Sequence, residues 1–255
     1  MKALLSIEGV TVRFGGVDAL ADVGFGVPRG ALLGLIGPNG AGKTTMMRVI
    51  TGMVRPQAGR LAIDGTEISR LPTHRRVRMG LGLSQQLVRP FAGMTAVENV
   101  ALAAGHATTA NPLAALVTIS RAAERDRART LLQLVGIADA ADALPDKLPL
   151  GYLKRLEMAR ALALDPKVLL LDEPLAGLNS AEAPHLADTI ADLNRQGTTV
   201  VLIEHNLIEV MRICRHLVVL DNGRKIGDGE PAVVMADPAV RAAYLGSQEE
   251  RHAAA

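Results

Sequence analysis

The sequence contains few aromatic residues and a single cysteine. Its 255 residues include three Phe, two Tyr and no Trp, and Cys214 is the one cysteine. One cysteine excludes a disulfide framework, and it excludes a zinc site built from several cysteines. We therefore interpret Cys214 as a small apolar residue of the core.

Long hydrophobic runs are also missing. The apolar runs at residues 168–171 and 199–203 have the length of a strand, whereas a membrane-spanning helix needs roughly 20 apolar residues. Glu8 comes too early for the apolar region of a signal peptide, and no cleavage-site pattern follows it. These features predict a cytosolic chain, which leaves docking on a membrane protein open.

An excess of charge of one sign is likewise absent, because 28 Lys and Arg face 26 Asp and Glu and leave a net charge of +2. That balance excludes a dominant basic field of the kind that binds nucleic acid. A hydrophobic fraction of 49% and a charged fraction of 21% exclude extensive disorder. The length allows one large domain, or a core with a subdomain.

The first half of the chain reads mainly as strands. Short β-branched segments and turn residues predict strands over residues 4–14 and 17–27 and a hairpin over residues 59–68. Residues 31–36 are continuously apolar, which is typical of a strand buried on both faces, and a helix is predicted over residues 43–51.

The second half alternates between strands and helices, which favours a mostly parallel α/β sheet. The predicted strands cover residues 167–172, 199–203 and 216–220, and the predicted helices cover residues 181–195 and 206–213, followed by a hairpin over residues 221–229 and a helical tail. Between the two halves, residues 95–145 are rich in Ala, Leu and Arg. Helical spacing over residues 121–135 predicts that this stretch is a helical insertion.

The strongest chemical signal is a glycine-rich loop at residues 37–45, between a predicted strand and a predicted helix. Its residues are Gly37, Pro38, Asn39, Gly40, Ala41, Gly42, Lys43, Thr44 and Thr45. Backbone N–H groups in such a loop surround a phosphate, and the start of the next helix favours an anion. Lys43 is predicted to reach the β- and γ-phosphates, and the Thr44 hydroxyl to bind Mg²⁺.

Two carboxylates follow the apolar strand at residues 168–171. Asp172 and Glu173 are expected at the carboxyl edge of the sheet, where open α/β folds bind their ligands. Asp172 is suited to hold Mg²⁺ through water. Glu173 is placed to polarise an attacking water as a general base.

With these motifs, His205 after the apolar run at residues 200–203 makes the chain resemble the ABC-type ATPases. The resemblance covers residues 4–246, and it implies that ATP and Mg²⁺ are bound. It also implies that His205 contacts the γ-phosphate and the attacking water, although a lone His is more often structural. In this family a Gln at the end of another strand, here the strand directly before residues 85 and 86, binds Mg²⁺ and the attacking water. Gln86 fits that place better than Gln85, and the alternative is a polar strand end.

Three further features follow from the resemblance. Phe14 matches the aromatic residue that stacks on adenine, with a core Phe as the alternative. The signature loop, usually Leu-Ser-Gly-Gly-Gln, corresponds to Leu148, Pro149, Leu150, Gly151 and Tyr152. Pro149 removes a hydroxyl and a backbone donor that would face the ATP of the opposite subunit. Leu178 and Asn179 resemble the loop that crosses the dimer interface, where Asn replaces the usual Asp; an equally good local interpretation is a turn that starts the next helix.

Within this family the chain looks most like the ATP-binding subunits of branched-chain (hydrophobic) amino acid importers. That resemblance rests on Phe14 and its neighbours, the stretch from Arg89 to Thr95, residues 156–160, residues 203–205 and the Tyr244-Leu-Gly tail. The lipopolysaccharide-export ATPase is a close relative with the same tail. A non-transport ABC ATPase acting on DNA or ribosomes is the third alternative, but the chain lacks the long coiled-coil insertion or tandem domains usual there.

The resemblance implies an α/β P-loop fold, an ABC-type nucleotide-binding domain with an antiparallel β patch and a helical subdomain. We expect a discontinuous core over residues 1–93 and 155–235, a helical subdomain over residues 94–154 and a helical tail over residues 236–255. Two ATPase subunits, alike or different, would sandwich two ATP molecules and drive membrane permeases, with a solute-binding protein acting indirectly. Such a chain lies peripherally on the cytoplasmic face of the inner (plasma) membrane, with no nucleic acid as partner.

Overall fold

The computed structural model describes residues 3–84, 89–105 and 121–244. Its centre is a six-stranded sheet in the order β10-β9-β3-β8-β7-β6. The strands are β3 (Leu32–Ile36), β6 (Leu81–Ser84), β7 (Val168–Asp172), β8 (Thr199–Ile203), β9 (His216–Asp221) and β10 (Arg224–Gly229). All neighbours run parallel except the hairpin of β9 and β10. The parallel sheet that the alternating pattern predicts is therefore confirmed.

A second sheet of four antiparallel strands has the order β2-β1-β4-β5. Its strands are β1 (Ala3–Phe14), β2 (Val17–Pro28), β4 (Ala58–Ile63) and β5 (Thr66–Glu67). The hairpin predicted over residues 59–68 is present as β4 and β5, and Asp64 and Gly65 between them have the positive φ, 53° and 79°, that such a tight turn requires. This sheet is the antiparallel β patch that was expected.

Side chains alternate between two cores along the central strands. Leu33 and Leu35 of β3 pack into a cluster with the antiparallel sheet and with α1 (Lys43–Thr51), while Leu32 and Ile36 pack into the cluster on the other face. The second cluster also holds apolar residues of α8 (Glu182–Arg195) and of α9 (Leu207–Ile213). Both faces of the central sheet are thus covered, which explains the unbroken apolar runs in its strands.

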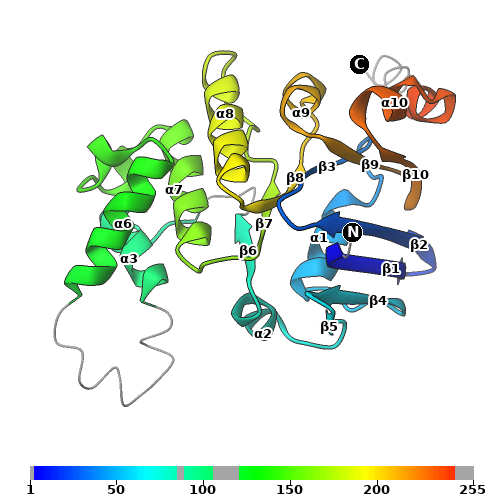
Figure 1. Ribbon diagram of the computed structural model, residues 1–255, viewed down its shortest axis with the longest axis horizontal. Helices are drawn as coiled ribbons and strands as arrows, with labels where there is room; N and C mark the ends of the chain where they lie inside the picture. Colours follow the sequence, from blue (N-terminus) through cyan, green and yellow to red (C-terminus); the bar gives the residue numbers. More distant parts are fainter. Residues whose placement is uncertain (1–2, 85–88, 106–120, 245–255) are drawn as a thin grey trace.

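The helical insertion lies at one end of the molecule, opposite the antiparallel sheet (Figure 1). It contains α3 (Ala96–Ala104), α6 (Ala122–Leu134), two short 3₁₀ turns (Ala138–Ala140 and Pro145–Lys147) and α7 (Leu150–Leu162). Thr95 and Glu98 form a capping box that fixes the start of α3. Because α7 also packs against β6 and β7, it joins this insertion to the central sheet.

Sequence analysis did not predict α2 (Thr73–Arg78), which is short and basic. Its Arg76 is fully buried and donates to the carbonyl oxygens of Val49 (2.6 Å) and Ile50 (2.8 Å) at the end of α1. The same guanidinium donates to the carbonyls of Ser69 and Leu71. Backbone oxygens therefore replace water around this cation and tie α2 to the last turn of α1.

The predicted helical tail is helical over residues 238–244, and it follows α10 (Pro231–Ala236), which sequence analysis did not predict. Burial raises the pKa of the Tyr244 hydroxyl, which lies beside the backbone of Gly37. Leu245 and Gly246 of the tail motif lie outside the described residues. In the described part of the chain, no helix has the length and apolar character that would let it cross a bilayer.

Candidate nucleotide-binding site

The glycine-rich loop between β3 and α1 has the backbone that a phosphate cradle requires. Gly37, Gly40 and Gly42 have φ values of 150°, 80° and 102°, in the region that favours glycine. A Cβ at Gly37 would collide with the carbonyl oxygen of Leu220, and a Cβ at Gly42 would lie 2.7 Å from that of Ala19. A side chain at either position would therefore displace the loop from the strands that hold it.

Lys43, the first residue of α1, folds back over this loop. Its ammonium donates to the carbonyl oxygens of Gly37 (2.7 Å) and Pro38 (2.8 Å). Burial lowers the pKa of Lys43, and the nearby Glu173 and Asp172 carboxylates act in the opposite direction. These two loop carbonyls hold the ammonium over the loop, in the place where phosphate oxygens would compete for it.

A pocket of about 300 Å³ opens above the loop. It is lined by Ala19 of β2, by Glu173 and by the loop residues Asn39, Gly40, Ala41, Gly42, Lys43, Thr44 and Thr45. The structure therefore brings the predicted phosphate-binding loop and the predicted general base to one cavity. Ala19, which sequence analysis did not single out, reaches the cavity from the antiparallel sheet.

Asp172 and Glu173 lie at the carboxyl end of β7, as predicted. Burial raises the pKa of the Asp172 carboxyl, and the adjacent Glu173 raises it further, whereas Arg48, Lys154 and Lys43 lower it. Glu173 has a φ of 47°, which is unusual for a residue with a side chain. Its N–H donates to the carbonyl of Ile203 at the end of the neighbouring strand (2.9 Å).

His205 follows the end of β8 and lies near the carboxylates of Glu173 and Glu204. Its Nδ1 lies 3.9 Å from Oε1 of Glu173 and 3.9 Å from Oε2 of Glu204, beyond hydrogen-bond distance. The imidazole is 59% exposed and is thus accessible to a ligand. Glu204, which sequence analysis left without a role, is fully buried and accepts a hydrogen bond from the N–H of Leu175 (2.7 Å). Burial raises its pKa, which the N–H donors of Leu175 and His205 oppose.

The oxygen donors at this edge suit Mg²⁺. The Thr44 hydroxyl and the Asp172 carboxylate are hard ligands, and Mg²⁺ is usually held by one or two such groups together with phosphates and water. Across the residues that the structure describes, no group of three or more His, Cys, Asp or Glu is placed to hold a metal. The two oxygen donors are thus of the kind that hold Mg²⁺ together with phosphate oxygens. Gln86, the other predicted ligand, lies outside the described residues.

The predicted signature loop is partly helical. Pro149 occupies the N-cap position of α7, so Leu150, Gly151 and Tyr152 form its first turn. Leu148 and Pro149 precede the helix, and Leu150 is 42% exposed. The N–H of Tyr152 donates to the carbonyl of Pro149 (3.0 Å), so the amides of Leu150 and Gly151 are the ones that give this helix start its anion-favouring end, even though Pro149 has no N–H.

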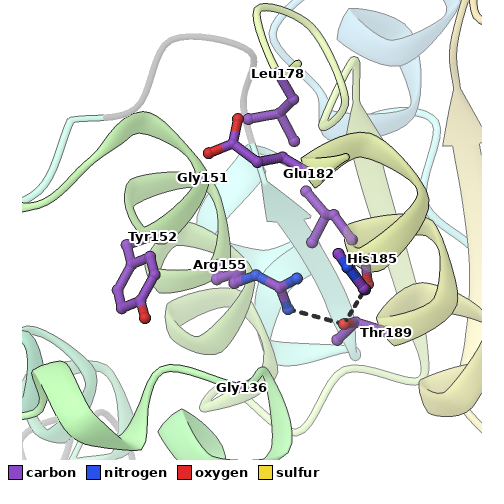
Figure 2. A pocket seen from close by; sticks show the side chains of 9 residues that line it. Gly136, Gly151, Tyr152, Arg155, Leu178, Glu182, His185 and Thr189 are labelled. Atoms are coloured by element: carbon purple, nitrogen blue, oxygen red, sulfur yellow. Dashed lines mark hydrogen bonds between the residues drawn. The ribbon is translucent and has the colours of Figure 1, made fainter. Parts of the chain in front are cut away.

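A second pocket, of about 390 Å³, lies between α7 and α8 (Figure 2). Gly151, Tyr152 and Leu178 line it, so the predicted signature and interface residues meet there. Arg155 crosses this pocket and donates to the carbonyl of Val135 (2.7 Å) and to the hydroxyl of Thr189 (2.8 Å). The predicted signature and interface residues, which we call the signature side, therefore contribute to a pocket of their own, separate from the cavity above the glycine-rich loop.

The structure also shows where two other predicted residues, Asn179 and Phe14, lie. The Asn179 carboxamide accepts from the N–H groups of Ala181 and Glu182, both at 2.9 Å, which supports the interpretation as a turn leading into α8. Phe14 ends β1 and is 52% exposed, so the alternative of a core Phe is wrong. Its ring is not among the residues that line the cavity above the loop.

Comparison with known proteins places this geometry in a family. The ABC transporter family model matches residues 20–176, and a branched-chain amino acid ATP-binding cassette transporter model matches residues 224–250. The branched-chain amino acid transport ATP-binding protein BraF of Pseudomonas aeruginosa is 39% identical, over 96% of this chain and 98% of its own length. LivG of Escherichia coli, with the same description, is 36% identical over the same shares. The lipopolysaccharide export ATP-binding protein LptB of Acidithiobacillus ferridurans is 35% identical, over 97% and 99%.

Solved structures agree with this assignment. The ADP conformation of MJ1267, an ATP-binding cassette of an ABC transporter, superposes with a TM-score of 0.84 at 29% identity. The match covers 96% of this chain and all of the other. The fold is therefore that of an ABC ATPase domain, and the chain belongs to the ABC transporter family of ATP-binding proteins.

Proposed function

We propose that this chain is the ATP-hydrolysing motor subunit of an ABC importer for branched-chain or other hydrophobic amino acids. The observation that carries the proposal is the match of residues 224–250 to the branched-chain amino acid transporter model. Identity to BraF and LivG, spread over 96% of the chain, supports the same specificity. ATP binding would close two ATPase subunits over two nucleotides, and hydrolysis would reopen them.

In this proposal the cavity above the glycine-rich loop holds the phosphates of ATP. Lys43 exchanges its two loop carbonyls for β- and γ-phosphate oxygens, which its position over the loop favours. Glu173 lines the same cavity and accepts the proton of the attacking water. The Nδ1 atom of His205 lies 3.9 Å from Oε1 of Glu173, and this imidazole would contact the γ-phosphate and the attacking water. Thr44, Asp172 and Gln86 would hold Mg²⁺, which neutralises phosphate charge when bound.

The exposed ring of Phe14 would stack on adenine, and the first turn of α7 would face the ATP of the opposite subunit. Stacking of a base on an aromatic ring contributes about 1–3 kcal/mol. Gly151 permits close approach of the second subunit, and the α7 amides favour the γ-phosphate. Leu178 and Asn179 would lie at the boundary between the two subunits.

A permease would dock on the segment from Arg89 to Met94, between α3 and α7. The Phe91 ring is 49% exposed, and the Arg160 guanidinium lies 5.2 Å from its centroid. Asn99 of α3 donates to the carbonyl of Phe91 (3.1 Å), while the Glu157 carboxylate of α7 accepts from the N–H of Arg89 (3.1 Å). An exposed aromatic ring on a segment fixed from two helices suits the docking of an apolar helix.

The alternative is the motor of a lipopolysaccharide-type exporter, which the 35% identity to LptB supports. In either case the chain would lie peripherally on the cytoplasmic face of the inner (plasma) membrane. Its direct partners would be permease subunits and a second ATPase subunit, and an importer would add a solute-binding protein. ATPases that act on DNA or ribosomes are a third class, which the net charge of +2 disfavours.

Purification of the tagged chain from its native membranes in mild detergent tests the proposal. We expect two multispanning permeases and a second, similar ATPase to co-purify. The associated binding protein should then bind leucine, isoleucine or valine in a calorimetric titration. Recovery with export machinery would support the exporter instead, and recovery only with nucleic acid or ribosomes would contradict both transport proposals.

A further inference from the structure

Lys154, on the inner face of α7, is a buried cation next to the predicted catalytic carboxylates. Only 6% of its surface is exposed, and its ammonium donates to the backbone carbonyl of Glu173 (3.2 Å). Burial lowers the pKa of Lys154, and the charges of Glu204, Glu173 and Asp172 act in the opposite direction. A lysine is costly to bury, so its retention among three carboxylates calls for a role.

Besides the bond from Ala176 to the Glu173 carbonyl within the turn, three hydrogen bonds tie the turn that carries Glu173 to other parts of the fold. The N–H of Glu173 donates to Ile203 at 2.9 Å, its carbonyl accepts from Lys154 at 3.2 Å, and the N–H of Leu175 donates to Glu204 at 2.7 Å. The acceptors of two of these bonds, Ile203 and Glu204, lie at the end of β8, just before His205. The Lys154 bond alone comes from α7, the helix whose first turn is the signature side.

The backbone of Glu173 needs such support. Its φ of 47° lies in the left-handed region, which costs a residue with a side chain roughly 1–3 kcal/mol unless its surroundings fix it. Rotation of this one residue would swing the carboxylate relative to the cavity above the glycine-rich loop. A bond to its carbonyl therefore restricts rotation of the main chain from which the side chain projects.

We propose that Lys154 is a positioning residue that holds the Glu173 main chain, so that the orientation of the general base depends on the seating of α7. This inference rests on the proposed function. In it, α7 has a second role besides facing the ATP of the opposite subunit, because it fixes the orientation of the general base in its own subunit. Lys154 is not among the residues that line the cavity above the glycine-rich loop, and in this proposal its effect passes through the Glu173 carbonyl.

The test compares ATP hydrolysis by the assembly that co-purifies with the wild-type chain, Lys154→Met, Lys154→Arg and the control Lys167→Met. Lys154→Met should lower kcat about 10- to 100-fold, the size of effect that a small misplacement of a reacting group produces. Its KM for ATP and its Kd for a fluorescent ATP analogue should stay within about twofold. Lys154→Arg keeps a donor and should recover kcat to within about threefold. Lys167, exposed at the other end of β7 and paired with Asp64, should tolerate Met without effect.

A double-mutant cycle with Glu173→Gln separates positioning from general damage. If Lys154 acts through Glu173, adding Lys154→Met to Glu173→Gln should change residual hydrolysis by less than about threefold. A full additional 10- to 100-fold loss, loss of ATP affinity in Lys154→Met, or failure of Arg to recover kcat would each overturn the inference.

Because Ala176 also donates to the Glu173 carbonyl, Met leaves that oxygen paired. Should Lys154→Met not fold, as judged by thermal melting, Lys154→Leu, which also lacks a donor, takes its place with the same expected outcomes. An inactive wild-type assembly would contradict the proposed function itself, whereas an active one with an unchanged Lys154→Met would contradict only this inference.

Discussion

The two sides of the molecule predicted to meet ATP are built differently. The glycine-rich loop between β3 and α1 offers a cavity where backbone, Lys43 and Glu173 converge, and its glycines are required by their φ values and by contacts with other strands. The signature side consists of one helix start, where Pro149 caps α7 without a hydroxyl or an N–H.

This difference indicates where the sequence is free to vary. On the loop side, Gly37 and Gly42 are each fixed by two constraints, a positive φ and a backbone carbonyl that leaves no room for a Cβ. On the signature side, the α7 amides of Leu150 and Gly151 present the same positive end whatever side chain precedes them. A departure from the usual signature pattern is therefore tolerable in a way that a departure in the loop is not.

The largest effect that would sharpen this comparison is expected from Lys43→Ala. Without the ammonium over the loop, hydrolysis should fall by about 10²–10³-fold, the usual loss when a preorganised charge is removed from a reacting phosphate. ATP affinity, measured with a fluorescent analogue, should fall as well. The surface substitution Lys167→Ala is the control, and a Lys43→Ala chain that hydrolyses ATP normally would show that the phosphates bind elsewhere.

Phe14→Ala tests the reach of the loop side toward the base of the nucleotide. Loss of stacking should raise KM for ATP about tenfold, within the range of 1–3 kcal/mol for a base on an aromatic ring, and leave kcat unchanged. Stability should not change, because the ring is half exposed. Phe91→Ala removes an equally exposed ring from the far side of the molecule and should leave KM for ATP as it is. Equal effects of both substitutions would contradict adenine stacking at Phe14.

Asp172→Asn tests whether the buried carboxylate of Asp172 lowers the free energy of unfolding. Burial and Glu173 raise the Asp172 pKa, so the folded chain binds this proton more readily than the unfolded chain. The free energy of unfolding should accordingly be higher at acid pH and fall as pH rises through the raised pKa. Near neutral pH, in the absence of Mg²⁺ and nucleotide, Asp172→Asn should raise Tm, by about 2–4 °C for each kcal/mol. The exposed Asp142 gives the control, since Asp142→Asn should move Tm by less than 1 °C, roughly the limit expected of a surface change. A lower Tm for Asp172→Asn would contradict the argument.

The smallest effect is expected from Pro149→Ser on the signature side. A serine at the N-cap should stabilise α7 by roughly 1 kcal/mol, because its oxygen accepts from the first turn. Hydrolysis should change by less than about threefold, since the α7 amides already favour the phosphate. A tenfold rise in kcat would show that Pro149 weakens the site completed by this loop.

Much of this site could be predicted because local patterns carry it. Unbroken apolar runs followed by Asp172 or by Glu204 and His205 indicate parallel strands whose carboxyl ends meet at one edge, and the structure confirms that edge. The glycine spacing at residues 37–45 likewise indicates a loop, and its backbone requires those glycines. Fold and loop thus follow from short stretches of sequence.

The interactions that sequence analysis missed are single buried ions. Arg76, Lys154 and Glu204 have no periodicity that separates them from surface charges, yet each is buried and bonded to the backbone of a distant segment. Arg76 bonds to the end of α1, whereas Lys154 and Glu204 bond to the turn after β7. Their partners are 19 to 29 residues away in the chain, so only the tertiary fold identifies them.

The measurement that tests the central claim most directly is single-turnover hydrolysis of ATP by Glu173→Gln, compared with wild type at equal nucleotide occupancy. Glutamine keeps the shape of the side chain but cannot take the proton of the attacking water. We expect hydrolysis to slow by about two to four orders of magnitude, as for loss of a general base, while Kd for ATP stays within about twofold. Hydrolysis at the wild-type rate would contradict the assignment of Glu173 as the general base of this motor.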